Sequence, residues 1–401
     1  MQRIFALAEI APIDNGGNCR LALSDDDRDG RDLVLSWMRD LNLDIGIDSI
    51  GNVIGTWNVG SGSPVLTGSH IDTVRTGGKY DGNYGVLAGL EVIETCQRAG
   101  YEPSRPLAVG LFTNEEGARF APDMLGSLVY VGGLQLEEAL DIVAIDGARL
   151  GDELTRIGYA GPLPCPGPAP HAYVELHIEQ GPLLEAQGVC IGAVTGVQGI
   201  SWQELTILGQ SNHAGTTPMT MRHDPAYVAA EIAVFVRKLA IRFGAHQVCT
   251  AAKIDLYPNL INVVPARATI TLDIRNTDET ILRKAELEVI EFVKSISDTE
   301  GVSIASRTLA RFEPVVFDSR IVNCVEQAAG KLNNSVHRMP SGAGHDAQML
   351  ARVCPSGMIF VPSVKGISHN PAEFTSEQDL HAGANVLLQV MLELAETDFS
   401  T

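Results

Sequence analysis

Histidine and carboxylate side chains gather in four short stretches of this sequence, each close behind an apolar run. The first stretch, GSHIDTVRTGGKYDG, holds His70, Asp72 and Asp81. His70 and Asp72 are two residues apart on what we expect to be extended chain, so their side chains point the same way. Asp72 then accepts from one imidazole nitrogen and leaves the other nitrogen free for a metal ion. An N-capping Asp81 and an ordinary strand-end histidine explain this stretch alone equally well.

The other three stretches repeat this arrangement of an apolar run followed by a ligand-type side chain. They are Leu107–Phe112 with Glu115 and Glu116, Tyr173–Leu176 with His177, and Met358–Val361 with His369. Two adjacent carboxylates after a buried strand are costly unless something positive holds them. Consecutive side chains diverge, so one of the pair can ligate a metal while the other faces a bound water. The recurrence is far more specific than any one motif.

The apolar runs predict the elements that position these side chains. Val65–Thr67 and the three runs above are typical of buried strands in a parallel sheet. Val86–Cys96 has the periodicity of a helix, and the glycines before it place Asp81 in a strand-to-helix loop. Sheets of α/β proteins keep their ligands in such loops. We therefore predict an α/β fold with a mixed, mainly parallel sheet.

The pattern changes in residues 199–311. Strand and helix signals there follow the order strand, helix, strand, strand, helix, strand, which is typical of a ferredoxin-like sandwich. No strand of this segment ends in a ligand-type residue. We therefore predict a catalytic domain formed by residues 1–198 and 312–401, split by an inserted α+β domain at 199–311.

Composition narrows the classes of partner. The chain has 401 residues, enough for two domains, and 29 Lys and Arg against 49 Asp and Glu give a net charge of -20. This charge argues against nucleic acid or an anionic membrane as partner. The longest apolar runs have the length of core strands, so we expect no membrane span. The seven cysteines are scattered without a CxxC pair, which is typical of reduced thiols in a cytoplasm, and none lies beside the ligand motifs.

Six motifs, spread along the chain, resemble one known family. They are GSHIDT, KYDGNYG, TNEEGARF, HIEQGP, NHAGTTPM and GISHNPAEFT. The sequence resembles the dinuclear metal amidases of the hydantoinase/carbamoylase type, a branch of the aminoacylase and carboxypeptidase family of zinc hydrolases. N-carbamoyl-L-amino acid hydrolases, β-ureidopropionases and allantoate amidohydrolases belong to this branch. The resemblance implies a homodimer in which the smaller domain serves as lid and dimer contact.

The resemblance also implies a set of metal ligands. Asp81 bridges two divalent ions, with His70 and His177 at one ion and Glu116 and His369 at the other. Nitrogen and oxygen ligands without sulfur suit zinc, and also manganese, cobalt or nickel. Relatives that cleave peptides usually have a carboxylate at the position of His177, so the histidine favours an amidase.

Catalytic roles follow from the same resemblance. Glu115 is the expected general base, which takes a proton from the attacking water and passes it to the leaving nitrogen; the alternative is a residue that only orients a ligand. Asp72 is expected to orient rather than to ligate. His213, in NHAGTTPM, matches a histidine that reaches the partner subunit's site and stabilises the oxyanion. Arg222 either holds this loop or contacts substrate.

Further positions match substrate contacts of the family. Asn262 and Arg275 are two of them, and an arginine fork is the expected clamp for a substrate carboxylate. For Arg275 the alternative is a surface ion pair with Asp273 or Asp255. The positions that line the ureido end are Gln180 and, in the loop 342–346, Gly344 and His345.

The predicted function is hydrolysis of the C–N bond of an N-carbamoyl (ureido) L-amino acid, with release of amino acid, ammonia and carbon dioxide. The nearest alternative is allantoate amidohydrolase; such relatives tend to carry Arg at the position of Trp202, where carbamoylases more often have Trp. A dipeptidase or aminoacylase is disfavoured by His177. A non-catalytic metal-binding relative is disfavoured because ligands, base and arginine clamp are all present.

Overall fold

The computed structural model describes residues 1–244 and 246–399. Residue 245 of the predicted inserted domain and residues 400 and 401 of the predicted catalytic domain lie outside the described residues. By its internal contacts the chain forms two compact units. The first unit consists of Met1–Val197 and Val316–Thr401, and the second unit of Gln198–Val315.

A nine-stranded sheet forms the core of the first unit, in the order β1-β2-β4-β3-β5-β15-β6-β13 with β14 beside β6. Its strands are β1 (Asp44–Ile47), β2 (Val53–Trp57), β3 (Val65–His70), β4 (Leu107–Phe112), β5 (Ala172–Ile178), β6 (Ile191–Val197), β13 (Val315–Val316), β14 (Val336–Ser341) and β15 (Ser356–Val361). The central neighbours β4, β3, β5 and β15 run parallel, while β2 and β6 join them antiparallel. The predicted α/β fold with a mixed, mainly parallel sheet is confirmed.

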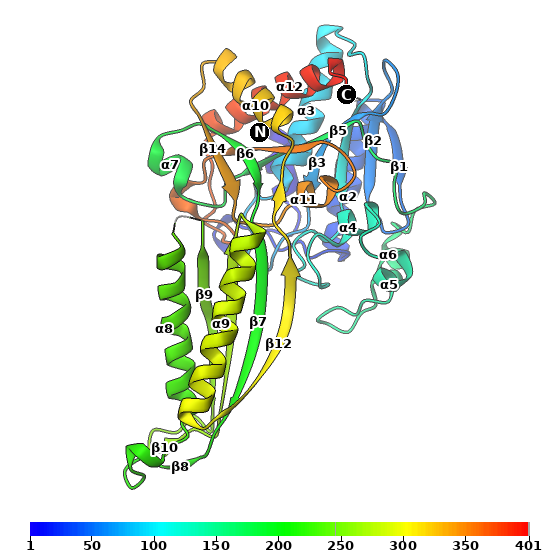
Figure 1. Ribbon diagram of the computed structural model, residues 1–401. Coiled ribbons are helices and arrows are strands. Elements are labelled where there is room, and N and C mark those ends of the chain that lie inside the picture. Colours follow the sequence, from blue (N-terminus) through cyan, green and yellow to red (C-terminus); the bar gives the residue numbers. More distant parts are fainter. Residues whose placement is uncertain (245, 400–401) are drawn as a thin grey trace. The chain divides into compact units, whose positions relative to one another are not determined.

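The central strands are the apolar runs of the sequence, and every residue of β3, β4, β5 and β15 is buried. Such runs form strands because both faces of a parallel sheet are covered by other elements. The helices of this unit are α1 (Gln2–Ala8), α2 (Asp25–Asp40), α3 (Asn83–Ala99), α4 (Leu125–Tyr130), α5 (Leu136–Leu140), α6 (Leu150–Ile157), α7 (Leu183–Gln187), α10 (Ser319–Lys331), α11 (Asp346–Leu350) and α12 (Glu377–Glu396). Helices α3 and α12 pack on the central strands and on each other (Figure 1).

Helix α3 begins without a capping side chain. Gly82 takes the N-cap position with a φ of 63°, a left-handed value that favours glycine. A Cβ atom at Gly82 would lie 2.4 Å from the His70 ring. The glycine therefore lets the helix start directly against the end of β3, where the predicted ligands gather.

The second unit is a four-stranded antiparallel sheet in the order β12-β7-β11-β9. Its elements are β7 (Gly199–Leu208), α8 (Pro225–Phe243), β9 (Val248–Tyr257), β11 (Arg267–Asn276), α9 (Glu279–Glu300) and β12 (Ser303–Phe312). The apolar side chains of α8 and α9 pack on one face of this sheet and form its core. This strand order is that of a ferredoxin-like fold. Two short strands, β8 (Asn212–His213) and β10 (Val263–Val264), pair with each other.

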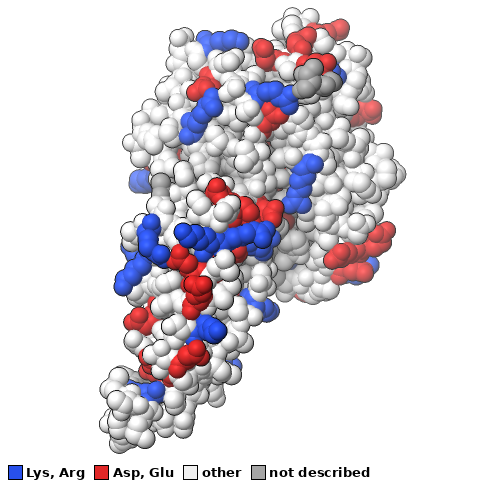
Figure 2. All heavy atoms as spheres, viewed as in Figure 1, with Lys and Arg blue, Asp and Glu red and all other residues white. Residues whose placement is uncertain are grey.

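The surface carries both signs of charge. On the face drawn in Figure 2, Lys and Arg side chains lie interspersed with Asp and Glu side chains. Among the helices of the described residues, none combines the length and the apolar character that crossing a membrane requires.

Candidate active site

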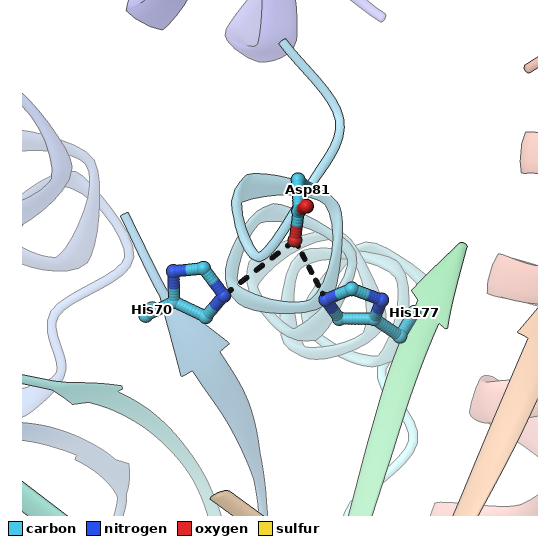
Figure 3. Close-up of side chains that lie close together, drawn as sticks. All are labelled: His70, Asp81 and His177. Carbon is cyan, nitrogen blue, oxygen red and sulfur yellow. Dashed lines mark ion pairs between the residues drawn. The ribbon is translucent and has the colours of Figure 1, made fainter. Parts of the chain in front are cut away.

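Two histidines stand side by side at the ends of neighbouring parallel strands. His70 is the last residue of β3, and the register of β3 with β5 pairs Thr67 with Val174. Three residues further along both strands, His70 therefore lies level with His177, and their ring centroids are 6.2 Å apart. Figure 3 shows the Asp81 carboxylate pointing between the two rings. Asp81 Oδ1 lies 3.7 Å from His70 Nε2 and 3.1 Å from His177 Nε2.

Backbone carbonyls fix the tautomers of both rings. His70 Nδ1 lies 2.9 Å from the carbonyl oxygen of Asp72, and His177 Nδ1 lies 2.8 Å from that of Ile178. Since a carbonyl oxygen can only accept, Nδ1 carries the proton in each ring. In the neutral form of each ring, the Nε2 lone pair then faces Asp81. The Gly82 N–H, which donates to His177 Nε2 at 3.2 Å, agrees with this assignment.

A second group of ligand-type atoms gathers on the other side of Asp81. His369 Nε2 lies 3.5 Å from Asp81 Oδ2 and 3.2 Å from Glu116 Oε2. The hydrogen bond to Glu116 raises the pKa of His369 to about 9. The side chain of His369 is 51% exposed, whereas that of Asp81 is 5% exposed. Each oxygen of Asp81 thus faces its own set of potential metal-ligand atoms, a placement that suits a carboxylate between two cations.

Within each of these two groups, one ligand atom per residue lies within 4.8 Å of the others. We name them the buried group (His70, Asp81 and His177) and the outer group (Asp81, Glu116 and His369). The residues come from four loops or strand ends that are far apart in the sequence. The sequence prediction that these five side chains converge agrees with this placement, and their roles as ligands stay a prediction.

The predicted contact between the Asp72 carboxylate and the His70 ring is wrong. Asp72 Oδ1 lies 3.9 Å from His70 Nδ1, too far for a hydrogen bond, and the backbone carbonyl of Asp72 takes that place. The carboxylate instead accepts the backbone N–H groups of Glu115 at 3.2 Å and of Glu116 at 3.3 Å. Asp72 therefore holds the loop that carries both glutamates.

Glu115 is buried beside the buried group. Its Oε2 atom lies 3.3 Å from His70 Nε2, and the residue is 7% exposed. Burial raises the pKa of Glu115 well above its ordinary range, and the charges of Asp346 and Glu116 raise it further. Burial and the charge of Asp81 likewise raise the pKa of Glu116, and burial raises the pKa of Asp72 to about 7. So many buried carboxylates fit a site for divalent cations, because positive charge would stabilise their ionised forms.

Gln180 and His345 contact the ligand candidates directly. Gln180 Nε2 donates to Asp81 Oδ2 at 2.7 Å, while Gln180 Oε1 is buried without a hydrogen-bond partner. The His345 ring packs against His177 with centroids 4.6 Å apart, and His345 Nε2 lies 3.0 Å from Ser341 Oγ. Gly344 precedes His345, and a Cβ atom there would lie 2.9 Å from the end of the Met124 side chain.

Two buried glutamates beside the ligands were not among the predicted site residues. Glu175 lies two residues before His177 on β5 and accepts from the Ser69 hydroxyl at 2.7 Å and the Ala347 N–H at 2.8 Å. Glu373 accepts the backbone N–H of Asp81 at 3.2 Å. A charged residue inside the apolar run AYVELHI was the available signal for Glu175. Glu373 lies four residues after His369 in GISHNPAEFT, where only the histidine was predicted to be a site residue.

In the second unit, the strand pair β8 and β10 holds His213 next to Asn262. The Asn262 carbonyl accepts the Ala214 N–H at 3.0 Å. His213 Nδ1 accepts the N–H groups of Gly215 at 3.1 Å and of Thr216 at 3.2 Å, so the neutral ring carries its proton on Nε2. Arg222 donates to backbone carbonyls of this loop, including Thr217, and so holds the loop in place.

Arg275 forms the ion pair that the sequence left open as an alternative. Its Nη2 atom lies 2.8 Å from Asp273 Oδ2, and its guanidinium carbon lies 5.9 Å from the centre of the Trp202 ring. Trp202 and Asp273 are direct cross-strand partners of β7 and β11. Arg275 and Trp202 thus form one group on the sheet.

This arginine group and His213 lie at opposite ends of the second unit's sheet. Trp202 is near the start of β7, six residues before Leu208 at its end, and β8 follows that end. Six residues of strand span about 20 Å. Figure 1 shows β8 and β10 beyond one end of the long strands. The structure of one unit does not bring His213 and Arg275 together.

Comparisons with known proteins identify the family. Residues 66–393 match peptidase family M20/M25/M40. The chain is 41% identical over 395 residues to an N-carbamoyl-L-amino-acid amidohydrolase of Rhizobium meliloti, covering 98% of this chain and 95% of the relative. It is 36% identical over 386 residues to the allantoate amidohydrolase of Escherichia coli, covering 95% and 93%.

Solved structures support the same family. The crystal structure of a hydantoinase/carbamoylase family amidase from Burkholderia multivorans is similar with a TM-score of 0.95 and 42% identity, covering 98% of this chain and 96% of that one. The chain belongs to peptidase family M20/M25/M40 and, within it, to the hydantoinase/carbamoylase amidases. It is a hydrolase of that branch.

Proposed function

We propose that this hydrolase cleaves the terminal C–N bond of N-carbamoyl L-amino acids and releases the amino acid, ammonia and carbon dioxide. The observation that carries the proposal is the placement of Asp81, with Oδ1 facing His70 and His177 and Oδ2 facing His369. Full-length similarity to an N-carbamoyl-L-amino-acid amidohydrolase supports the substrate class.

Two divalent ions per subunit fit these residues, and zinc suits the nitrogen and oxygen donors, as do manganese, cobalt and nickel. The buried group would hold one ion and the outer group the other, with Asp81 shared between them. When bound, such ions polarise a carbonyl oxygen and lower the pKa of water.

The side chains of the protein supply the proton transfers. Glu115 accepts a proton from the attacking water as the water oxygen bonds to the carbamoyl carbon. The bond from that carbon to the terminal nitrogen then breaks, and Glu115 returns the proton so that ammonia leaves. The remaining carbamate loses carbon dioxide and becomes the amino acid. Asp72 orients Glu115 by holding its backbone N–H.

The second unit supplies the groups that recognise substrate. His213 presents its Nε2 proton, which can donate to the oxyanion that develops on the carbamoyl oxygen. Arg275 exchanges its ion pair with Asp273 for the substrate carboxylate. The unpartnered Oε1 atom of Gln180, in the first unit, is a suitable acceptor for the ureido N–H groups.

We infer a homodimer from the substrate-binding roles proposed for His213 and Arg275. His213 and Arg275 lie about 20 Å apart along the sheet, farther than one ureido amino acid reaches. One substrate can contact both residues only if they come from two copies of the chain. We therefore propose that the second unit is both the lid and the dimer contact. The seven cysteines, all within the described residues, are free, which supports a cytoplasmic location.

A substrate panel tests this function. Chelator-treated protein reloaded with zinc, manganese, cobalt or nickel is assayed for ammonia release from N-carbamoyl amino acids, β-ureidopropionate and allantoate. We expect the highest kcat/KM with an N-carbamoyl L-amino acid. Preference for allantoate would support the alternative, and cleavage of dipeptides without ammonia release from any ureido acid would refute both.

A further inference from the structure

Glu373 joins the two loops that carry Asp81 and His369. Its Oε1 atom accepts the backbone N–H groups of Tyr80 at 3.0 Å and of Asp81 at 3.2 Å, residues that lie 293 and 292 positions away in the sequence. Its Oε2 atom lies 3.0 Å from the Ser368 hydroxyl. Glu373 is 3% exposed, so these contacts are shielded from water.

Ser368 extends this contact to the Asp81 side chain. The Ser368 hydroxyl lies 3.0 Å from Asp81 Oδ2, the oxygen that faces His369, and 3.0 Å from Glu373 Oε2. Glu373 therefore fixes Asp81 through its backbone N–H, and the Ser368 hydroxyl, whose single proton can be donated to either carboxylate, lies between the two side chains.

The same turn holds His369 in an unusual conformation. His369 has a φ of 52°, in the left-handed region that non-glycine residues rarely adopt. The Glu373 N–H donates to the Asn370 carbonyl at 2.9 Å, and the Thr76 hydroxyl donates to the His369 carbonyl at 3.2 Å. Such a conformation persists only where its surroundings hold it.

Glu373 packs closely against the backbone at Gly78. A Cβ atom at Gly78 would lie 2.1 Å from Glu373 Oε1. Its Oε1 atom already accepts two backbone N–H groups and its Oε2 atom faces the Ser368 hydroxyl, so the geometry suits a residue that supports ligands and does not suit a ligand.

We propose that Glu373 is a positioning residue that sets the distance between Asp81 and His369, and thereby how tightly the outer group holds a metal ion. This inference rests on the proposed metal site. The residues that orient metal ligands typically change metal affinity by about 10–100-fold when they are mutated.

Zinc titration of the chelator-treated full-length protein tests the inference. In Glu373→Ala the weaker zinc affinity should fall by about 10–100-fold. In Glu373→Gln it should stay close to that of wild type, because the amide oxygen still accepts both N–H groups and the amide nitrogen can donate to Ser368. Equal losses in the Gln and Ala variants would show that the charge of Glu373 acts on the ion directly, which overturns the positioning role.

Asp48→Ala is the matched control. Asp48 is also a buried carboxylate that accepts two backbone N–H groups, from Ile50 and Asn52, but it contacts neither the buried nor the outer group. The control should lower the thermal unfolding temperature of the metal-free protein without changing zinc affinity. Parallel losses of stability and unchanged zinc affinity in Glu373→Ala would reduce Glu373 to a structural residue and overturn the inference.

Ser368→Ala keeps the test decisive if Glu373→Ala does not fold. This variant removes only the hydroxyl between Glu373 and Asp81, and we expect a smaller loss of zinc affinity. Wild-type affinity in Ser368→Ala, with Glu373→Ala unfolded, overturns the inference. A wild-type protein that binds no zinc overturns the proposed metal site itself, whereas wild-type binding with unchanged variants overturns this inference alone.

Discussion

The carboxylate of Asp72 accepts the backbone N–H of Glu115 at 3.2 Å, while the backbone carbonyl of Asp72 orients His70. One residue thus serves two neighbours with two different groups. The two roles can be separated by mutation, because a change of the side chain leaves the carbonyl in place.

Asp72→Asn should lower kcat and weaken metal binding by the outer group, because the carboxylate holds the loop that carries both Glu115 and Glu116. The amide has one oxygen and would turn its own N–H₂ group toward Glu115 or Glu116, so the loop shifts while His70 keeps its tautomer. We expect a loss of about 10–100-fold in kcat, as for other residues that orient a site. Steady-state kinetics and metal analysis of the same preparation check this. An unchanged metal content in Asp72→Asn would mean that the outer group does not depend on the hold of Asp72 on this loop.

Glu115→Gln should fold and bind metal as wild type does, because the amide has the same shape and Glu115 is not one of the proposed ligands. As the proposed general base, its loss should lower kcat by at least roughly 10²–10⁴-fold. Glu116→Gln is the informative comparison, since Glu116 belongs to the outer group and its variant should lose metal. A reduced metal content in Glu115→Gln would place Glu115 among the ligands.

Removal of metal should abolish activity, and zinc, manganese or cobalt should restore it. His177→Ala and His369→Ala should each lower the metal content, because each removes one donor nitrogen from a different group. The measurement is metal per subunit after dialysis, alongside ammonia release. Full activity in the chelated protein, or a covalent acyl-enzyme trapped on Ser or Cys, would contradict the proposed mechanism.

Mixed dimers test whether His213 and Arg275 reach one active site from different copies of the chain. His213→Ala and Arg275→Ala should each be nearly inactive on their own, and after subunit exchange half of the dimers contain one copy of each. If one site takes His213 and Arg275 from different copies, each mixed dimer has one intact site. Activity should then return to about a quarter of the wild-type value.

The control for this experiment is a mixture of His213→Ala and Asn262→Ala. These residues lie together at the β8 and β10 pair, so every site in the mixed dimer should lack one of them. We expect no recovery in the control. Failure of the His213 and Arg275 pair to recover, with subunit exchange verified, would mean that both residues serve one site from the same copy.

Asp48 gives a prediction for pH. Burial raises its pKa from 3.8 to about 6 in the folded protein. Between these values the folded state binds more protons than the unfolded state, so the contribution of Asp48 to stability falls as pH rises from about 4 to 6. A difference of this size corresponds to about 3 kcal/mol.

The matching variant is Asp48→Asn, which does not titrate. Its free energy of unfolding in urea, relative to wild type, should improve by up to about 3 kcal/mol between pH 4 and pH 7. The lost hydrogen bond to Asn52 adds a cost that does not depend on pH. A relative stability that stays constant over this range would contradict the assigned pKa.

The central strands and the convergence of the proposed ligands could be predicted from the sequence because both follow from local patterns. An apolar run that ends in His70 or His177 fixes a strand and, by the rule for parallel sheets, the edge on which its last side chain lies. The period of two does not determine which group of Asp72 reaches the ring, because β3 ends at His70 and Asp72 lies beyond it. That choice depends on a loop 43 residues away, at Glu115.

Other features depend on contacts that no local pattern encodes. Glu373 acts on residues nearly 300 positions earlier in the chain, so its neighbours become visible only in the folded structure. The distance between His213 and Arg275 depends on strand register, because a position along the sheet follows from pairing partners and not from spacing in the sequence.

Helix α3 is flanked by two glycines with nearly the same backbone conformation, Gly82 with a φ of 63° and Gly100 with a φ of 64°. At Gly82 an added methyl group would strike the His70 ring, while at Gly100 it would meet nothing within 4 Å. The two ends of one helix therefore differ in the variation they tolerate. A side chain at Gly82 is opposed by both the backbone conformation and the His70 ring, whereas a side chain at Gly100 is opposed by the backbone conformation alone.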